Sequence, residues 1–414
     1  MQQDAQPYHA RREALIRAAG DGLILVRGAA GATVNPSFFY LTGIREPAGA
    51  LLLSKQSFRI GSGRRHPGPN YSDGREATQV LFLPGADPMA ERWGEAGDAN
   101  TGTVQADAVG VDIVANVQEF EEALVKVLPR VETLHVVRGA PVGLSATGNS
   151  DTKLVDRIRR NFFGLTIRDA TPIVAEMRRL KDPREVAAIE RALAVTAEAL
   201  GRAMPLARPG AKEYQVEAEI TRTYRAHGGT HGFTPIVGAG SNALKLHYIQ
   251  NTGTIGDGDL VLIDTGVSID GYGCDISRTF PAGGTFSERQ REVYEVVLAA
   301  QEAAIAACRP RATLGDVHRA AYAVIEQAGF AEQFLHGTSH HLGLETHDVG
   351  DVLAPLAPGA VITVEPGIYL DDEGIGIRIE DDVLVTESEA RVLGPGIPKT
   401  VAEIEALMGG GVSA

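Results

Sequence analysis

The chain has 414 residues, which corresponds to about two or three domains, and 44% of them are apolar, enough to form substantial cores. This composition excludes a chain that is disordered over most of its length, a collagen-like repeat and a small disulfide scaffold. The 39 Lys and Arg residues are outnumbered by 53 Asp and Glu residues, which gives a formal charge of −14. Such a balance argues against binding to nucleic acid and to anionic membrane surfaces, because both favour basic proteins.

The start of the chain carries Arg11, Arg12 and Arg17 but no apolar core with a small-residue cleavage site, so we expect no signal peptide. The sequence contains no stretch of about 18 uninterrupted apolar residues, so we predict no membrane span. The two cysteines, Cys274 and Cys308, cannot form a disulfide framework, which favours a reducing compartment. We therefore expect a cytoplasmic protein that is not bound to a membrane.

The first part of the chain alternates short apolar runs with helical patterns. Buried strands are predicted at residues 22–27, 49–54, 79–84 and 133–138, and residues 117–127 have helical spacing. Residues 61–74 are rich in Gly, Pro and Arg and predict a long loop. Alternating strands and helices predict an α/β domain over residues 1–170.

The pattern changes near residue 181. Asp182 and Glu185 flank Pro183 in the arrangement of a helix start with a capping box. Further helices are predicted after Gly210, from Ser287 onward and up to Gly329. Strand-like runs are found at residues 259–264, 360–366 and 376–386. Residues 171–414 are therefore predicted to form a separate domain of mixed α and β structure.

Two acids occur at positions where the local pattern favours apolar residues. Asp264 ends the run Leu-Val-Leu-Ile, and Asp275 follows beyond the glycine-bearing segment 270–273. A hairpin of this length brings the two carboxylates side by side. They would then repel each other, so one is protonated unless a cation lies between them. The alternative is that each acid pairs with an arginine, such as Arg278.

Four of the 11 histidines fall within a short segment: His336, His340, His341 and His347. Imidazole is the commonest metal ligand and proton carrier in proteins, so we interpret the cluster as functional. Isolated histidines are usually exposed or hydrogen-bonded within a core, and we expect this of His341.

Two further acids lie within apolar strands. Glu365 ends the run Val-Ile-Thr-Val, and Glu380 stands two residues after Arg378, on the same face of a strand. A local arginine–glutamate pair is the simpler explanation of the second acid. Taken with the earlier acids and one histidine, however, the set suits two divalent cations about 3.5–4 Å apart that share a bridging carboxylate.

The ordered series Asp264, Asp275, His340, Glu365 and Glu380 resembles the metallopeptidases of the pita-bread fold, which include methionine aminopeptidase, aminopeptidase P and prolidase. The flanking residues are similar to the Xaa-Pro branch: Leu-His247-Tyr, Asp275-Ile-Ser-Arg-Thr-Phe, the segment 336–348, Glu365-Pro-Gly-Ile-Tyr369 and Gly-Ile-Arg-Ile-Glu380. Residues 39–43 and 81–84 resemble the N-terminal domain of that branch, which methionine aminopeptidases lack. The resemblance implies a creatinase-like α/β domain followed by an α+β pita-bread catalytic domain.

The resemblance also implies a ligand set. Asp264 would bind one metal ion, His340 and Glu365 the other, and Asp275 with Glu380 would bridge the two. Carboxylate-rich ligation favours two Mn²⁺ ions, with Zn²⁺ or Co²⁺ as alternatives.

Roles in catalysis follow from the same resemblance. The nucleophile would be a water or hydroxide held between the ions, and Glu365 would accept its proton as general base. His247 and His347 would stabilise the tetrahedral intermediate and transfer a proton. The residues expected to contact substrate are His336, Arg378 and Tyr369. Arg378 would hold Asp264 or the substrate, or else form a purely structural ion pair.

Xaa-Pro peptidases differ in the length of peptide that they accept. Aminopeptidase P accepts longer peptides, whereas prolidase requires a free carboxylate directly after proline. Relatives of aminopeptidase P carry an acid in a stretch that reads Asn-Pro-Ser-Phe at residues 35–38 here, so that acid is missing. Arg45 follows in the same loop, with Arg64 and Arg65 beyond it, and an arginine fork binds a carboxylate well, unless Arg45 merely pairs with Glu46. We therefore prefer an Xaa-Pro dipeptidase (prolidase), with aminopeptidase P as the alternative.

A third function belongs to a different class. Some pita-bread proteins have lost their metals and act as interaction modules, but they have typically lost several ligand carboxylates. All five ligand positions are filled here, so we rank this function last. The expected partners are Xaa-Pro dipeptides or short peptides, and a second copy of the chain in a homodimer, because relatives generally dimerise.

Overall fold

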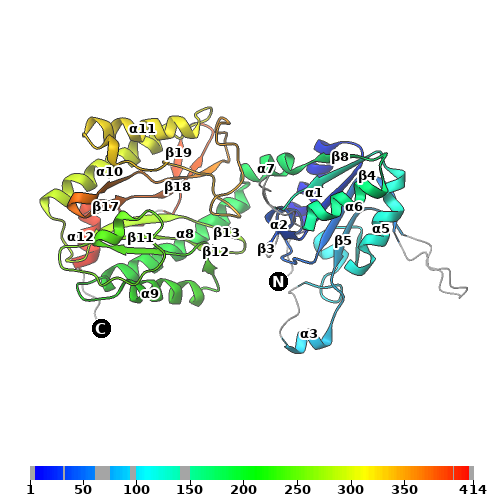
Figure 1. Cartoon of the computed structure of the whole chain (residues 1–414), viewed down its shortest axis with the longest axis horizontal. Coiled ribbons are helices and arrows are strands. Elements are labelled where there is room, and N and C mark those ends of the chain that lie inside the picture. The colour runs from blue at the N-terminus through cyan, green and yellow to red at the C-terminus, as the bar shows by residue number, and fades with distance from the viewer. Residues whose placement is uncertain are drawn as a thin grey trace, which may run out of the picture. The chain divides into compact units, whose positions relative to one another are not determined.

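The computed structural model describes residues 5–30, 33–60, 75–93, 99–139, 150–394 and 396–409. The chain divides into two compact units, Met1–Met177 and Arg178–Ala414 (Figure 1), whereas the sequence patterns placed the boundary near residue 170. No helix in the described part of the chain combines the length and apolar character needed to cross a membrane.

The N-terminal unit is built on one mixed sheet with the strand order β6-β5-β4-β1-β7-β8. These strands are β1 (Leu23–Arg27), β4 (Ala50–Ile60), β5 (Arg75–Leu83), β6 (Ile113–Asn116), β7 (Thr133–Val137) and β8 (Thr166–Asp169), with β2 (Ala29–Ala30) and β3 (Thr33–Val34) forming a small separate ladder. The central strand β1 runs parallel to β7 and antiparallel to β4. The four strands predicted from sequence in this part are all present, which confirms its α/β fold.

Helices accompany this sheet: α1 (Gln6–Ala19), α2 (Pro36–Thr42), α3 (Pro88–Trp93), α4 (Ala106–Val109), α5 (Phe120–Val127), α6 (Ser150–Asn161) and α7 (Thr171–Arg179). The apolar face of α5 packs on the sheet, where Phe120 meets Phe82 with ring centroids 5.4 Å apart. The predicted loop at residues 61–74, which contains Arg64 and Arg65, lies outside the described residues.

The C-terminal unit contains helices α8 (Pro183–Ala203), α9 (Glu213–Ala226), α10 (Glu288–Ala307), α11 (Leu314–Gln327) and α12 (Val401–Gly409). The strands of this unit lie between the pair α8 and α9 and the pair α10 and α11 (Figure 1). The capping box predicted at Asp182 and Glu185 is formed, as is the one at Ser287 and Gln290. Each cap satisfies backbone amides that would otherwise lack a partner, which is typically worth about 1 kcal/mol.

The strands of this unit form small antiparallel sheets. One contains β10 (Ile236–Ala239), β11 (Leu260–Thr265) and β14 (Ile276–Pro281), and a second contains β9 (Thr230–His231), β12 (Val267–Ile269) and β13 (Tyr272–Gly273). The others are β15 (Val361–Val364), β18 (Asp381–Val385) and β19 (Ala390–Val392), and the pair β16 (Gly367–Leu370) and β17 (Ile375–Arg378). Separate helices and antiparallel strands make this unit α+β.

The hairpin predicted between the first two acids is confirmed. Ile269 pairs with Tyr272, so Asp270 and Gly271 form a two-residue turn, and both have positive φ (52° and 95°), as a hairpin turn of this kind requires. Further along the ladder, Asp264 pairs with Ser277. Asp275 precedes Ser277 by two residues and therefore points to the same face as Asp264.

The prediction of one continuous strand at residues 376–386 is wrong. The segment is divided into β17 and β18, which pair with β16 and β15 respectively. At this break, the amide of Glu380 donates to the carbonyl of Ser277 (3.1 Å). At the corresponding break between β15 and β16, the amide of Glu365 donates to the carbonyl of Thr338 (2.8 Å). Pro366 has no amide hydrogen to continue the ladder. Both glutamates therefore sit where the paired strands are interrupted.

Candidate active site

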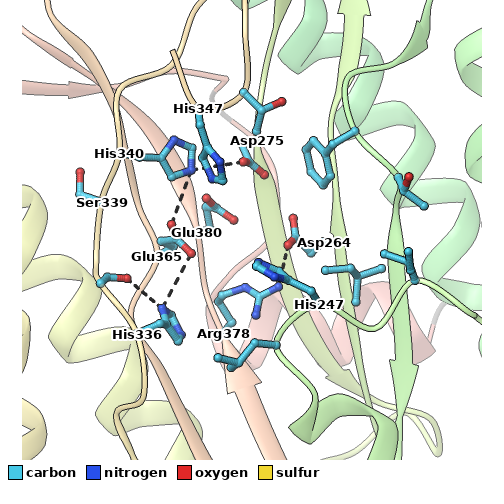
Figure 2. A pocket seen from close by; sticks show the side chains of 17 residues that line it. His247, Asp264, Asp275, His336, Ser339, His340, His347, Glu365, Arg378 and Glu380 are labelled. Carbon is cyan, nitrogen blue, oxygen red and sulfur yellow. Dashed lines mark hydrogen bonds and ion pairs between the residues drawn. The ribbon is translucent and has the colours of Figure 1, made fainter. Parts of the chain in front are cut away.

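A cavity of about 490 Å³ opens in the C-terminal unit, and Figure 2 shows the acidic side chains pointing into it from β11 and from segments next to other strands. Nine residues that the sequence singled out line it: His247, Asp264, Asp275, His336, His340, His347, Glu365, Arg378 and Glu380. Asp264 lies on β11 and Arg378 ends β17; the others come from the segments beside β14, β15 and β18, from the loop 334–350 and, for His247, from the segment before β11. The fold thus brings together residues that are more than a hundred positions apart in the chain.

Three acids in the cavity each keep one carboxylate oxygen without a partner. Oδ1 of Asp264, Oδ1 of Asp275 and Oε1 of Glu380 are buried, and none of them accepts a hydrogen bond from the described residues. A buried acceptor without a partner typically costs about 1–3 kcal/mol. An electropositive partner would satisfy these oxygens, and the described residues do not supply one.

Burial and close packing raise the pKa values of three acids in the cavity. Burial, followed by the negative charges of Glu380 and Asp264, raises the pKa of Asp275 well above its usual range. Burial and the neighbouring Glu365 raise the pKa of Glu380 in the same direction. Burial raises the pKa of Glu365 to about 7, although Arg378 opposes this shift. Each shift reflects the cost of collecting negative charge in a poorly solvated place.

The arginine alternative considered for these acids is only partly realised. Arg278 pairs with Asp381 (2.6 Å) instead, and among the described residues no lysine or arginine forms an ion pair with Asp275 or Glu380. Arg378 is the exception, because its Nη2 donates to Oδ2 of Asp264 at 2.6 Å. One guanidinium thus faces several carboxylates, and the site retains excess negative charge.

His340 offers a lone pair to the same place. Its Nδ1 lies 3.1 Å from the carbonyl oxygen of His341, which only accepts, so Nδ1 carries the hydrogen. Burial lowers the pKa of His340 to about 4, so the ring is neutral near pH 7 and Nε2 carries a free lone pair. Nε2 lies 3.5 Å from Oδ2 of Asp275 and 3.6 Å from Oε1 of Glu365. A metal-binding histidine usually has this arrangement, with the second nitrogen fixed by a carbonyl.

The residues present therefore fit a divalent cation. Asp275, His340 and Glu380 each present one ligand atom, and these three atoms lie within 4.8 Å of one another. Oxygen-rich sets with one imidazole suit Mn²⁺ and related ions. A cation here would satisfy the unpartnered oxygens and relieve the repulsion between the acids.

A buried chain of hydrogen bonds supports the site from behind. Nη1 of Arg378 donates to the hydroxyl of Tyr369 (3.0 Å), and that hydroxyl lies 2.9 Å from Nε2 of His336. Nδ1 of His336 donates to the carbonyl of Gly337 (2.8 Å), and burial lowers the pKa of His336 to about 4. The tyrosine therefore donates to a neutral imidazole. Tyr369 is 3% exposed and is not among the residues that line the cavity.

Arg45 lies in the other unit, where it is exposed and its guanidinium stands 4.9 Å above the ring of Phe39. In the stretch that lacks the acid, Asn35 caps helix α2 by accepting from the amide of Ser37.

Sequence analysis missed the apolar side of the cavity, formed by Phe233, Ile236, Leu246 and Ile249. Leu246 stands next to His247, which gave the only sequence signal for this wall. It also missed Ser277, whose position two residues after Asp275 places it on the same strand face.

Comparisons with known proteins agree with this geometry. Residues 187–387 match the model of metallopeptidase family M24, and residues 8–137 match that of the aminopeptidase P N-terminal domain. The Xaa-Pro aminopeptidase of Escherichia coli (strain K12) is 36% identical over 407 residues, spanning 90% of this chain and 88% of that protein. Xaa-Pro aminopeptidase 3 of Mus musculus is 31% identical over 402 residues, spanning 89% of this chain and 75% of that protein.

Solved structures show the same similarity over the whole chain. Aminopeptidase PepP of Pseudomonas aeruginosa matches with a TM-score of 0.86 and 31% identity, covering 100% of this chain and 99% of that one. Aminopeptidase P of E. coli with the inhibitor Pro-Leu matches with a TM-score of 0.81 and 34% identity, covering 98% of each chain. These matches confirm the predicted fold of a creatinase-like α/β domain followed by a pita-bread catalytic domain.

The names of these relatives favour the aminopeptidase alternative over the dipeptidase that the sequence led us to prefer. The metallopeptidase family also implies a requirement for divalent metal ions. By family model, by sequence identity and by structure, this chain belongs to the pita-bread Xaa-Pro metallopeptidases of family M24.

Proposed function

We propose that this protein is a metal-dependent Xaa-Pro aminopeptidase, which releases the first residue of a peptide whose second residue is proline. The observation that carries the proposal is one cavity lined by four acids and four histidines, in which buried carboxylate oxygens lack a partner among the described residues. Similarity to aminopeptidases over nearly the full chain supports this choice over a dipeptidase.

In this proposal the ligands divide between two cations. Asp264 would hold one, His340 and Glu365 would hold the other, and Asp275 with Glu380 would serve both. Bound divalent cations lower the pKa of a water molecule and polarise the scissile carbonyl. The oxygen-rich ligand set favours Mn²⁺, with Zn²⁺ and Co²⁺ as alternatives.

Side chains of the protein then accept and deliver the protons. Glu365, whose side chain is 19% exposed at the cavity, accepts a proton from the attacking water. When the bond between the Xaa carbonyl carbon and the proline nitrogen breaks, that nitrogen must gain a proton. His247 and His347 are exposed on the cavity wall and can deliver it, because imidazole exchanges protons readily near neutral pH.

The peptide itself lacks a hydrogen-bond donor at proline, so a strand-like backbone contact cannot hold it at that residue. The apolar wall of Phe233, Ile236, Leu246 and Ile249 supplies contacts for side chains and for the proline ring. Arg378 is assigned to holding Asp264 and Tyr369, which leaves polar contact with the substrate to the histidines.

Cleavage of three peptides tests the proposal: Ala-Pro-Ala, Ala-Pro and Ala-Ala-Ala, each with Mn²⁺-loaded and chelator-treated protein, with products identified by mass spectrometry. We expect alanine and Pro-Ala from the first peptide, little cleavage of the third, and loss of activity on chelation that Mn²⁺ restores. Cleavage of Ala-Pro alone would make the protein a dipeptidase. No cleavage of any peptide with Mn²⁺, Zn²⁺ or Co²⁺ would leave the interaction-protein alternative.

We further infer, from the family resemblance, a homodimer that works in the cytoplasm. The two buried thiols, Cys274 and Cys308, are free, which agrees with a reducing compartment. Sedimentation equilibrium of the full chain measures the mass in solution, and a monomer at micromolar concentration would contradict the dimer.

A further inference from the structure

We propose that Asp348, held by Arg178 and Lys181, is a positioning residue that fixes His347 at the cavity. The inference rests on the proposed function, because it assigns these residues a part in the same reaction. It concerns a cluster of charged side chains behind the loop 341–350, outside the set that faces the cavity.

The side chain of His347 makes few contacts that could fix its orientation. Its ring lines the cavity beside His340, with ring centroids 4.3 Å apart and an interplanar angle of 88° (Figure 2). The residue is exposed, and its ring makes no hydrogen bond within the described part of the chain. Its direction therefore depends on that one ring contact and on the backbone that carries it.

One guanidinium binds the side chains of residues on both sides of the histidine. Nη2 of Arg178 donates to Oε2 of Glu345 at 2.9 Å and to Oδ1 of Asp348 at 2.5 Å. Glu345 lies two residues before His347 and Asp348 directly follows it. The amide of Asp348 also donates to the carbonyl of His341 (2.9 Å), which links this turn to the residue next to His340.

Lys181 completes the surroundings of Asp348, with Nζ 3.4 Å from Oδ2. The side chains of Arg178, Lys181 and Asp348 are 3%, 1% and 1% exposed, whereas that of Glu345 is 47% exposed. Burying three charges is costly, and a buried ion pair seldom adds net stability over apolar residues of the same size. In this proposal the cluster instead fixes one geometry, since each charge needs its partners in place.

The Asp348 carboxylate packs closely against the backbone of Gly343. A Cβ atom added at Gly343 would overlap Oδ2 of Asp348 and lie 2.9 Å from Cε of Lys181. The loop therefore runs against the charged cluster without spare room, and a shift of Asp348 must move the adjacent His347. A misplacement of about 1 Å at a group that transfers protons can cost about 100-fold in rate.

A double-mutant cycle separates this role from general support of the fold. Asp348→Asn keeps the shape of the side chain but removes the charge that binds Arg178 and Lys181. We expect it to lower kcat for Ala-Pro-Ala at least 10-fold in the parent, with KM and bound metal within about twofold. In the His347→Ala background the same change should cost less than about twofold, because the group being positioned is already absent.

Asp351→Asn is the matched control, because Asp351 is an exposed acid directly after the loop 341–350 whose carboxylate accepts from the amide of Leu353. It should leave kcat unchanged. If Asp348→Asn is too unstable to purify, Arg178→Lys, which keeps the charge but not the shared guanidinium, is measured in both backgrounds under the same criterion.

Equal losses in the two backgrounds, loss of bound metal, or an unchanged kcat in the parent would each overturn the positioning role. These outcomes differ from failure of the proposed function, which is inactivity of the metal-loaded parent itself on Ala-Pro-Ala.

Discussion

Ser277 donates a hydrogen bond from its hydroxyl to Oε2 of Glu380 at 2.8 Å, and both side chains are buried. The same hydroxyl accepts from Nε of Arg378, also at 2.8 Å, and Arg378 in turn holds Oδ2 of Asp264. One oxygen of each acid is thereby fixed, and Oε1 of Glu380 and Oδ1 of Asp264 are left for a cation. Hydrogen-bond partners of this kind orient metal ligands.

Ser277→Ala is therefore expected to weaken metal binding about 10- to 100-fold, because Glu380 is then free to turn. Activity should recover to within a few-fold of the parent at saturating Mn²⁺. Titration of metal-free protein by calorimetry measures the affinity. Ser388→Ala, at an exposed serine, is the control and should bind as the parent does. Unchanged affinity in Ser277→Ala would show that Glu380 does not need this support.

Glu380→Ala should remove both turnover and stable metal occupancy, since the variant lacks a carboxylate assigned to both cations. We expect kcat/KM to fall by at least about 10³. Metal content by mass spectrometry, measured on the purified variant, accompanies the assay. A variant that keeps the full metal content and activity of the parent would rule out the ligand assignment.

His347→Ala should behave differently, because this histidine lines the cavity without belonging to the ligand set. The expected result is unchanged metal content with a fall in kcat/KM of about 10²- to 10⁴-fold, the usual contribution of a positioned proton-transfer group. His227→Ala is the control, at an exposed histidine that pairs with Glu198. Parental activity in His347→Ala would contradict the proton-transfer role and would also remove the basis of the role proposed for Asp348.

Removal of metal should destabilise the C-terminal unit, because its crowded carboxylates then lose their counter-charge. A ligand at 100 times its Kd stabilises the folded state by about 2.7 kcal/mol. Calorimetry should show an unfolding transition that moves to higher temperature as Mn²⁺ is added to chelated protein. If the unfolding temperature does not change as Mn²⁺ is added, the cavity binds no such ion.

The metal-free protein should become less stable as pH rises from about 4 to about 7. The pKa of Glu365 is raised to about 7 in the folded state, against about 4.3 in an unfolded chain. The folded state therefore binds this proton more tightly, so the stabilisation is complete below the unfolded pKa and is lost as pH rises through the folded one. Each such proton contributes a slope of about 1.4 kcal/mol per pH unit.

Glu365→Gln isolates this contribution, because glutamine does not titrate. Denaturant unfolding of chelated parent and variant at about pH 4.5, 6.0 and 7.5 should show a shallower decline for the variant. Parallel pH profiles for the two proteins would mean that Glu365 is not the group responsible.

Local chemistry made parts of this molecule predictable. The turn at Asp270 and Gly271 and the alternation of side chains along strands were enough to place Asp264 and Asp275 together. Capping residues likewise marked the starts of α8 and α10. In each case the deciding interactions join residues close in sequence, so the pattern itself carries the information.

Other features depend on contacts between distant segments. At the break between β17 and β18 the amide of Glu380 bonds to Ser277, and between β15 and β16 the amide of Glu365 bonds to Thr338; the local pattern identifies neither partner. Tyr369 was expected to contact substrate, but its hydroxyl lies between Arg378 and His336. The link from Arg178 to Asp348 spans 170 positions and leaves no periodic signal. Preference for a dipeptidase rested on an absent acid and on Arg45, and similarity along the whole chain outweighs it.

Anomalous diffraction from crystals of this protein grown with Mn²⁺ would locate the cations that the cavity is proposed to bind. We expect two anomalous peaks inside the cavity, about 3.5–4 Å apart, with Asp275 and Glu380 between them. A cavity without a peak, or with manganese bound only elsewhere on the chain, would contradict it.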